Sequence, residues 1–181
     1  MCIRDRDYED RYFKKYPGVR SYMDETQALA DEKGYVETIF GRRLYLPDIH
    51  AGNAIIRKAA QRTAINAPMQ GSAADIIKRA MIDISHWLAL DELDARMLLQ
   101  VHDELVFEVL EEDLDLIVEG VKFRMITAAS LDVPLVVDVG IGDNWDQAHW
   151  TKGSRVSCIS SSELPQPVSQ DFSRWINTDM S

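Results

Sequence analysis

The fold is decided by residues 100–109, which read Gln100-Val101-His102-Asp103-Glu104-Leu105-Val106-Phe107-Glu108-Val109. Apolar residues lead into the titratable cluster in this stretch and lead out of it again. A run this short, and this rich in branched and aromatic residues, is typical of strands rather than of a helix. We therefore predict a β-hairpin with His102, Asp103 and Glu104 at its bend.

The adjacent carboxylates of Asp103 and Glu104 allow two interpretations. They can be ordinary turn residues that face water. They can also bind a hard divalent cation, which offsets the cost of gathering negative charge beside apolar strands. Neighbouring residues on a strand point to opposite faces, so we expect Asp103 to be the direct ligand and Glu104 to act as an outer or water-mediated one. A two-metal site would need at least one more carboxylate from elsewhere in the fold.

Length and composition are those of a soluble globular protein. The 181 residues can form one domain or a piece of a larger one, and 46% of them are hydrophobic and 28% charged. No apolar run approaches the roughly 20 residues that span a bilayer, and residues 1–6 lack the apolar stretch of a signal peptide. We expect a cytoplasmic protein with no membrane partner. Cys2 and Cys158 stand near opposite ends and provide neither a disulfide framework nor a thiolate metal site.

Charge is distributed unevenly along the chain. The formal net charge is −10, which by itself argues against a nucleic-acid partner. Residues 34–80, however, hold seven basic and three acidic residues, whereas residues 103–119 hold eight acidic residues and no basic one. A basic middle segment can therefore meet phosphates while an acidic segment faces solvent.

The first part of the chain predicts helices followed by a small hairpin. Residues 8–33 read as helical with a break at Tyr16-Pro17-Gly18, because proline can start a new helix, and Gly34 provides a stop. Two strand-like runs follow at residues 35–39 and 43–46. Gly41 between them supplies the positive φ angle that a tight hairpin needs.

The middle of the chain predicts two helices separated by a break. Residues 54–66 are alanine-rich and helical, but Pro68 disfavours helical geometry at the residue before it. A second helix is expected to start after Gly71, with Ser72 as its N-cap and Asp75 completing a capping box. Its apolar stripe extends to about residue 88.

Three polar residues, Arg62, Asn66 and Gln70, are four positions apart and are called the polar row below. This spacing places them on about one side of the segment despite the expected break. Arg, Asn and Gln side chains suit hydrogen bonds to base edges, and every base pair offers a minor-groove acceptor at a nearly constant place. The polar row can therefore sense base pairing without reading sequence, or it can be an ordinary exposed helix face.

The last part of the chain predicts a helix, a strand and a tail. Residues 114–125 carry an apolar helical face behind the acidic residues 111–113, and Gly120 costs this helix about 1 kcal/mol relative to alanine. Residues 135–139 read as a strand, with Gly140 and Gly142 beyond it. Residues 150–181 are serine-rich without clear periodicity, and we expect them to be disordered.

Several strings of the sequence resemble, in the same order, family A DNA polymerases of the bacterial DNA polymerase I type. Residues 100–109 are similar to the third conserved motif of that family, and residues 34–47, 67–81 and 144–149 are similar to further strings of it. The resemblance extends over residues 8–149. Residues 1–7 and 150–181 have no counterpart in it.

The resemblance implies a DNA-templated nucleotidyltransferase that joins dNTPs to a primer 3′-hydroxyl in DNA replication and repair, using two Mg²⁺ ions. Asp103 and Glu104 would be its catalytic, metal-binding carboxylates. The polar row would contact primer-template DNA near its newest base pairs, and His102 would lie against the primer terminus. We expect the protein to be monomeric.

The implied fold class is α+β. A polymerase palm would combine an antiparallel sheet, which contains the hairpin, with packed helices at residues 72–88 and 111–125, and residues 8–47 would be the end of the fingers subdomain. The family's first motif, a strand with another catalytic Asp, and its nucleotide-gripping fingers helix are not found in the sequence. We therefore expect the 181 residues alone not to polymerise DNA.

Two other function classes are compatible with parts of the sequence. An HD-type metal phosphohydrolase would use His102 and Asp103, but it needs further histidine ligands on helices, and His50, His86 and His149 show no such arrangement. A non-catalytic DNA-binding module would need only the basic segment and the polar row.

Overall fold

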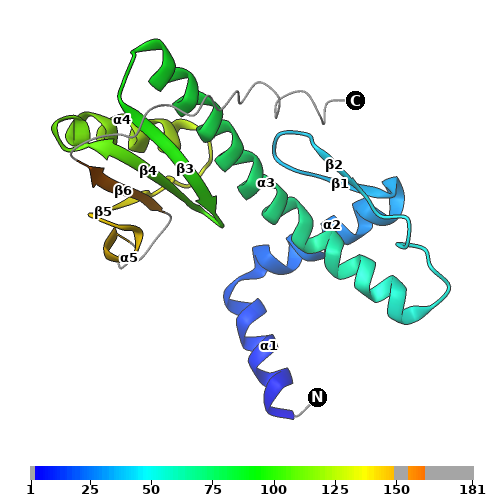
Figure 1. The fold of residues 1–181 in the computed structure, drawn as a ribbon. Coiled ribbons are helices and arrows are strands. Elements are labelled where there is room, and N and C mark those ends of the chain that lie inside the picture. The colour runs from blue at the N-terminus through cyan, green and yellow to red at the C-terminus, as the bar shows by residue number, and fades with distance from the viewer. Residues whose placement is uncertain (1–2, 149–154, 162–181) are drawn as a thin grey trace. The chain divides into compact units, whose positions relative to one another are not determined.

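The computed structural model describes residues 3–148 and 155–161, with side chains for residues 8–148 (Figure 1). The chain divides into two compact units, Met1–Met81 and Ile82–Ser181. Helix α3 (Ala54–Leu90) contributes to both. In the described part of the chain, no helix is long and apolar enough to cross a membrane.

Two helices with a proline between them begin the first unit, as predicted. Helix α1 spans Ile3–Lys15 and helix α2 spans Pro17–Lys33, with the proline in its first turn. Helix α2 ends at Gly34, which has a φ angle of +74° and donates its N–H to the carbonyl of Ala30 at 2.9 Å. A left-handed glycine of this kind is a common helix stop.

The predicted small hairpin follows. Strands β1 (Tyr35–Glu37) and β2 (Arg43–Tyr45) pair antiparallel and are shorter than the sequence indicated. Gly41 has a φ angle of +82°, so the expected role of this glycine in the turn is confirmed. The core of the first unit joins this hairpin region to α2 and to the alanine face of α3, and it comprises Ala30, Val36, Leu46, Ile49, Ala60 and Ala64.

Helix α3 runs unbroken through Pro68, so the predicted break and the predicted second start are wrong. Ser72 is not an N-cap: it is 8% exposed, and its hydroxyl donates to the carbonyl of Pro68 (2.5 Å) and accepts the N–H of Ile39 (3.0 Å). Asp75 binds Arg42 instead of completing a capping box. Proline inside a helix costs about 3 kcal/mol, and these tertiary contacts on the following turn offset that cost.

The second unit is built around a four-stranded sheet with the order β3-β4-β6-β5 (Figure 1). Strands β3 (Ala95–Val101) and β4 (Glu104–Leu110) form the predicted antiparallel hairpin. Strand β6 (Arg155–Ser161) runs parallel to β4 and to β5 (Asp138–Gly142). The sheet is therefore mixed rather than purely antiparallel, because β6 pairs parallel with both neighbours.

Two expectations for the C-terminal part need correction. Residues 155–161 form a strand, so the predicted disorder is wrong there, while residues 149–154 and 162–181 lie outside the described structure. Strand β5 begins at Asp138, three residues later than predicted, and it includes both glycines. A Cβ on Gly140 would lie 1.9 Å from the carbonyl oxygen of Ala148, so glycine lets helix α5 (Trp145–Ala148) pack on the strand.

The core of the second unit gathers on β4 and on helix α4 (Leu114–Thr127), which follows a 3₁₀ turn at Glu111–Asp113. The predicted apolar face of α4 is confirmed, because Ile117, Val121 and Met125 are buried. Gly120 is more than a weak point of this helix. A Cβ there would lie 2.1 Å from the ring of Trp87, so glycine makes room for the indole.

Replacing Gly120 with alanine should therefore destabilise the protein by about 1–3 kcal/mol through overpacking. Helix propensity alone would predict a gain of about 1 kcal/mol for the same change. The matched control is Gly18→Ala in α2, where an added Cβ meets nothing within 4 Å, and which should be neutral or stabilising. Urea unfolding measures both variants, and equal stabilisation by the two would contradict the packing role of Gly120.

Candidate functional site

The hairpin tip presents His102 and Asp103 to solvent. Both residues are exposed and form the turn between β3 and β4. His102 has a φ angle of +54°, which is uncommon for a residue other than glycine. The side-chain amide of Gln100 donates a hydrogen bond to the His102 carbonyl, which fixes this turn conformation.

Glu104 lies immediately behind the tip and has the opposite environment. It is the first residue of β4, is only 4% exposed, and accepts a hydrogen bond from the indole Nε1 of Trp145 at 3.2 Å. A buried carboxylate is costly unless it is hydrogen-bonded, so the indole N–H helps to stabilise the buried carboxylate of Glu104. The interpretation of both acids as turn residues facing water is therefore wrong for Glu104.

The two adjacent acids therefore have opposite environments: Asp103 is exposed in the turn, and Glu104 is buried at the start of β4. Asp103 is the acid able to reach an ion from solvent, and Glu104 can support it only from the protein side. Among the residues that the structure describes, no group of three or more His, Cys, Asp or Glu could hold a metal ion. A two-metal centre would need a further carboxylate beyond Asp103 and Glu104.

The polar row lies on α3 in the first unit. All three residues are exposed, and the helix that carries them is continuous, which aligns them more regularly than the predicted broken segment would. At 1.5 Å per residue the row extends along about 12 Å of helix axis. Successive base pairs are about 3.4 Å apart, so this length corresponds to roughly three or four base pairs.

A hydrogen-bond network beside the polar row was not predicted from the sequence. Arg42 donates through Nε to Asp75 Oδ1 (2.8 Å) and through Nη2 to the Gly71 carbonyl (3.2 Å), and its own N–H binds Thr38 Oγ1 (3.2 Å). The network fastens the β1–β2 hairpin to α3 next to Gln70.

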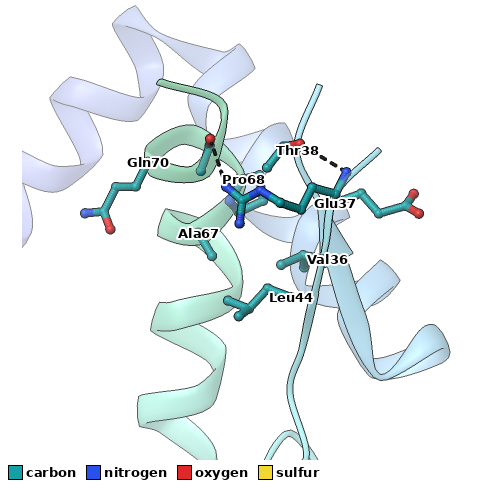
Figure 2. Close-up of a pocket in the computed structure, with 9 residues that line it drawn as sticks. Val36, Glu37, Thr38, Leu44, Ala67, Pro68 and Gln70 are labelled. Atoms are coloured by element: carbon teal, nitrogen blue, oxygen red, sulfur yellow. Dashed lines mark hydrogen bonds between the residues drawn. The ribbon is translucent and has the colours of Figure 1, made fainter. Parts of the chain in front are cut away.

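Figure 2 shows the small pocket of about 190 Å³ between this hairpin and α3. Val36, Leu44 and Ala67 line it, and the Gln70 side chain projects away from them. A Cβ on Gly71 would lie 2.7 Å from Thr38 Cγ2, so this glycine permits a close approach of the hairpin to the helix. A glycine in the middle of an otherwise strong helix was the available signal for this contact.

The chain is similar in sequence to known proteins. Residues 5–147 match the sequence model described as DNA polymerase family A. This chain belongs to that family. DNA polymerase I of Pseudomonas aeruginosa is 62% identical over 142 residues, which are 78% of this chain and 16% of that protein. DNA polymerase I of Geobacillus stearothermophilus is 49% identical over 142 residues, again 16% of its length.

A solved structure agrees with this membership. The POL domain of Pol1 from M. smegmatis, in complex with DNA primer-template and dNTP, has a TM-score of 0.68 and 46% sequence identity. It covers 70% of this chain, and the match covers 22% of that domain chain. The predicted family and the α+β fold class are therefore confirmed for a chain that spans about one sixth of its curated relatives' length.

The bond between Trp145 and Glu104 can be tested by a double-mutant cycle. Trp145→Phe removes one hydrogen-bond donor from a buried carboxylate and should lower the free energy of unfolding by about 1–3 kcal/mol. In a Glu104→Leu background the same change should cost less, since no carboxylate remains to be satisfied. Urea unfolding of the four proteins gives the coupling energy, and strictly additive effects would contradict the proposed coupling.

Proposed function

We propose that the whole protein is a DNA-directed DNA polymerase that transfers nucleotides from dNTPs to a primer 3′-hydroxyl during replication and repair. Family membership supports the activity class. The observation that carries the assignment of the site is the hairpin tip, where an exposed Asp103 stands directly before a buried, hydrogen-bonded Glu104. A fixed tip of this kind suits phosphoryl transfer, in which the protein's main contribution is positioning and electrostatics.

The polar row is proposed to bind the primer-template duplex. Its side chains can donate hydrogen bonds to the minor-groove acceptors of about three or four base pairs, independently of base sequence. Arg42 and Asp75 hold the β1–β2 hairpin against α3 at the end of the row, which stiffens the helix where Gln70 projects. We further propose that His102 contacts the primer terminus.

Asp103 is proposed as a direct ligand of Mg²⁺ and Glu104 as a supporting carboxylate that acts from the protein side. Two such ions supply activation of the primer hydroxyl and neutralisation of the triphosphate charge. The two acids alone are too few for this site, so a further carboxylate must come from another part of the whole polymerase. Residues 8–47 then correspond to the end of the fingers, and the hairpin sheet to the palm.

The chain of 181 residues is therefore expected to be inactive by itself. With Mg²⁺, dNTPs and a labelled primer-template, it should give no primer extension, while full-length Pseudomonas aeruginosa DNA polymerase I extends the primer as the positive control. Extension by the purified 181-residue chain would contradict the incomplete donor set. Release of phosphate from nucleotides without primer would instead favour the phosphohydrolase.

Duplex binding can be tested on the chain itself. Replacing Arg62, Asn66 and Gln70 together with alanine should weaken binding to a labelled primer-template at least about tenfold, because each lost base contact is worth roughly 1 kcal/mol or more. The matched control is Arg20→Ala, which removes one exposed positive charge from α2. Fluorescence anisotropy at fixed salt measures both proteins.

Two results of this binding experiment would count against the proposal. Equal affinities of the triple variant and the control would show that only general charge attracts the duplex. A strong preference among duplexes of different sequence would contradict recognition through the uniform minor-groove acceptors.

A further inference from the structure

An exposed lysine continues the polar row by one helical turn. Lys58 stands four positions before Arg62, which is the spacing that the members of the polar row have among themselves. Lys58 and the polar row are all exposed, and all belong to the unbroken helix α3 (Figure 1). At 1.5 Å per residue, the segment from Lys58 to Gln70 extends along about 18 Å of helix axis, which is the length of about five base-pair steps.

The twist of the helix gives Lys58 a different direction from the centre of the polar row. Four residues of an α-helix turn through about 400°, so each step of the row advances about 40° around the axis. The two neighbours of Asn66 in the row therefore lie within about 40° of it, whereas Lys58 lies about 80° away. A duplex whose minor groove faces Asn66 presents base edges to the polar row and its phosphate backbone to Lys58.

The surroundings of Lys58 leave its charge uncompensated. Residues 49–74 contain no Asp or Glu, although the whole chain carries a net charge of −10. Within the residues that the structure describes, Lys58 makes no ion pair, whereas Arg42 is paired with Asp75. The neighbouring Arg57 is not an equivalent cation, because its Nη1 donates to the carbonyl of Ala51 at 2.8 Å.

Helix stability does not explain a lysine at this position. The N-terminus of a helix favours acidic residues, because its first N–H groups carry partial positive charge. The first turn of α3 has no acidic residue, and Lys58 follows in the second turn. A residue that departs from such a local rule without a compensating contact is expected where function requires it.

We propose that Lys58 is a phosphate-binding residue of the DNA site and holds the sugar-phosphate backbone beside the minor groove. An ammonium group suits this role because it is a compact point charge, whereas the Arg, Asn and Gln side chains of the polar row match base edges. The inference rests on the proposed binding of the duplex by the polar row. It assigns to Lys58 a share of the affinity that is independent of base sequence and sensitive to salt.

The first test measures the salt dependence of duplex binding by the full chain. Lys58→Ala should weaken binding to a labelled primer-template at least about threefold at 50 mM salt, and should lower the slope of log affinity against log salt by about 0.9, because one phosphate contact is lost. The difference from the unmodified chain should shrink about three- to fourfold between 50 mM and 200 mM salt. Lys58→Arg should restore the affinity and the slope. Fluorescence anisotropy measures all three proteins.

The matched control is Lys78→Ala. Lys78 is also exposed on α3, but it lies about 160° around the axis from Arg62 and therefore on the opposite side of the helix. Its replacement removes the same charge and should leave the slope unchanged. Equal losses of slope in the two variants, or no loss in Lys58→Ala, would overturn the inference.

The second test locates the phosphate. In a series of primer-templates, one phosphate at a time is replaced with a neutral methylphosphonate. At one position, or at two adjacent positions, this replacement should weaken binding of the unmodified chain and leave binding of the Lys58→Ala chain unchanged. If every replacement affects the two chains equally, Lys58 contacts no particular phosphate and the inference is overturned.

These outcomes separate the inference from the proposed function. If alanine at all three positions of the polar row weakens binding while Lys58→Ala keeps the full slope, the polar row binds the duplex and the inference about Lys58 fails. If Lys58→Ala lowers the slope while the triple variant binds normally, the phosphate contact stands and the proposed groove contact of the polar row fails. If neither variant changes binding, both are overturned.

Discussion

Burial of β4 on both faces is the constraint on which the second unit depends. Phe107 and its apolar neighbours are withdrawn from water, and each fully buried side chain of this kind is worth about 1.5–3 kcal/mol. A slip of one residue would move every side chain of the strand to the opposite face, where its size no longer fits the close-packed neighbours, so the register is strongly fixed. The fixed register also fixes the hairpin tip. Asp103 stays exposed and Glu104 stays buried because β4 cannot shift relative to its neighbouring strand.

The sequence was most informative where a local rule and the tertiary structure agree. Proline before α2, glycine after it and glycine in the β1–β2 turn predicted their boundaries, because each residue restricts its own backbone. The hairpin was predictable from its branched and aromatic residues. These features depend on residues that are close together in the chain.

Prediction failed where distant residues decide the outcome. Pro68 breaks most helices, but contacts of the next turn with the hairpin, through Ser72 and Asp75, keep α3 continuous. The hydrogen bond from Trp145 to Glu104 joins residues that are 41 positions apart, and no pattern in the sequence indicates it. The pairing of β6 likewise could not be predicted, because a serine-rich segment carries little strand signal of its own.

The packing around Gly140 restricts which residue a homologue can have at this position. The Ala148 carbonyl oxygen occupies the place of its missing side chain, so all nineteen other amino acids meet the same obstacle, whatever their polarity. A homologue with any other residue here must lift its α5 off the sheet and with it the indole that reaches the buried acid. The residue at position 140 of an aligned relative therefore indicates whether the contact between the indole and the buried carboxylate can be retained.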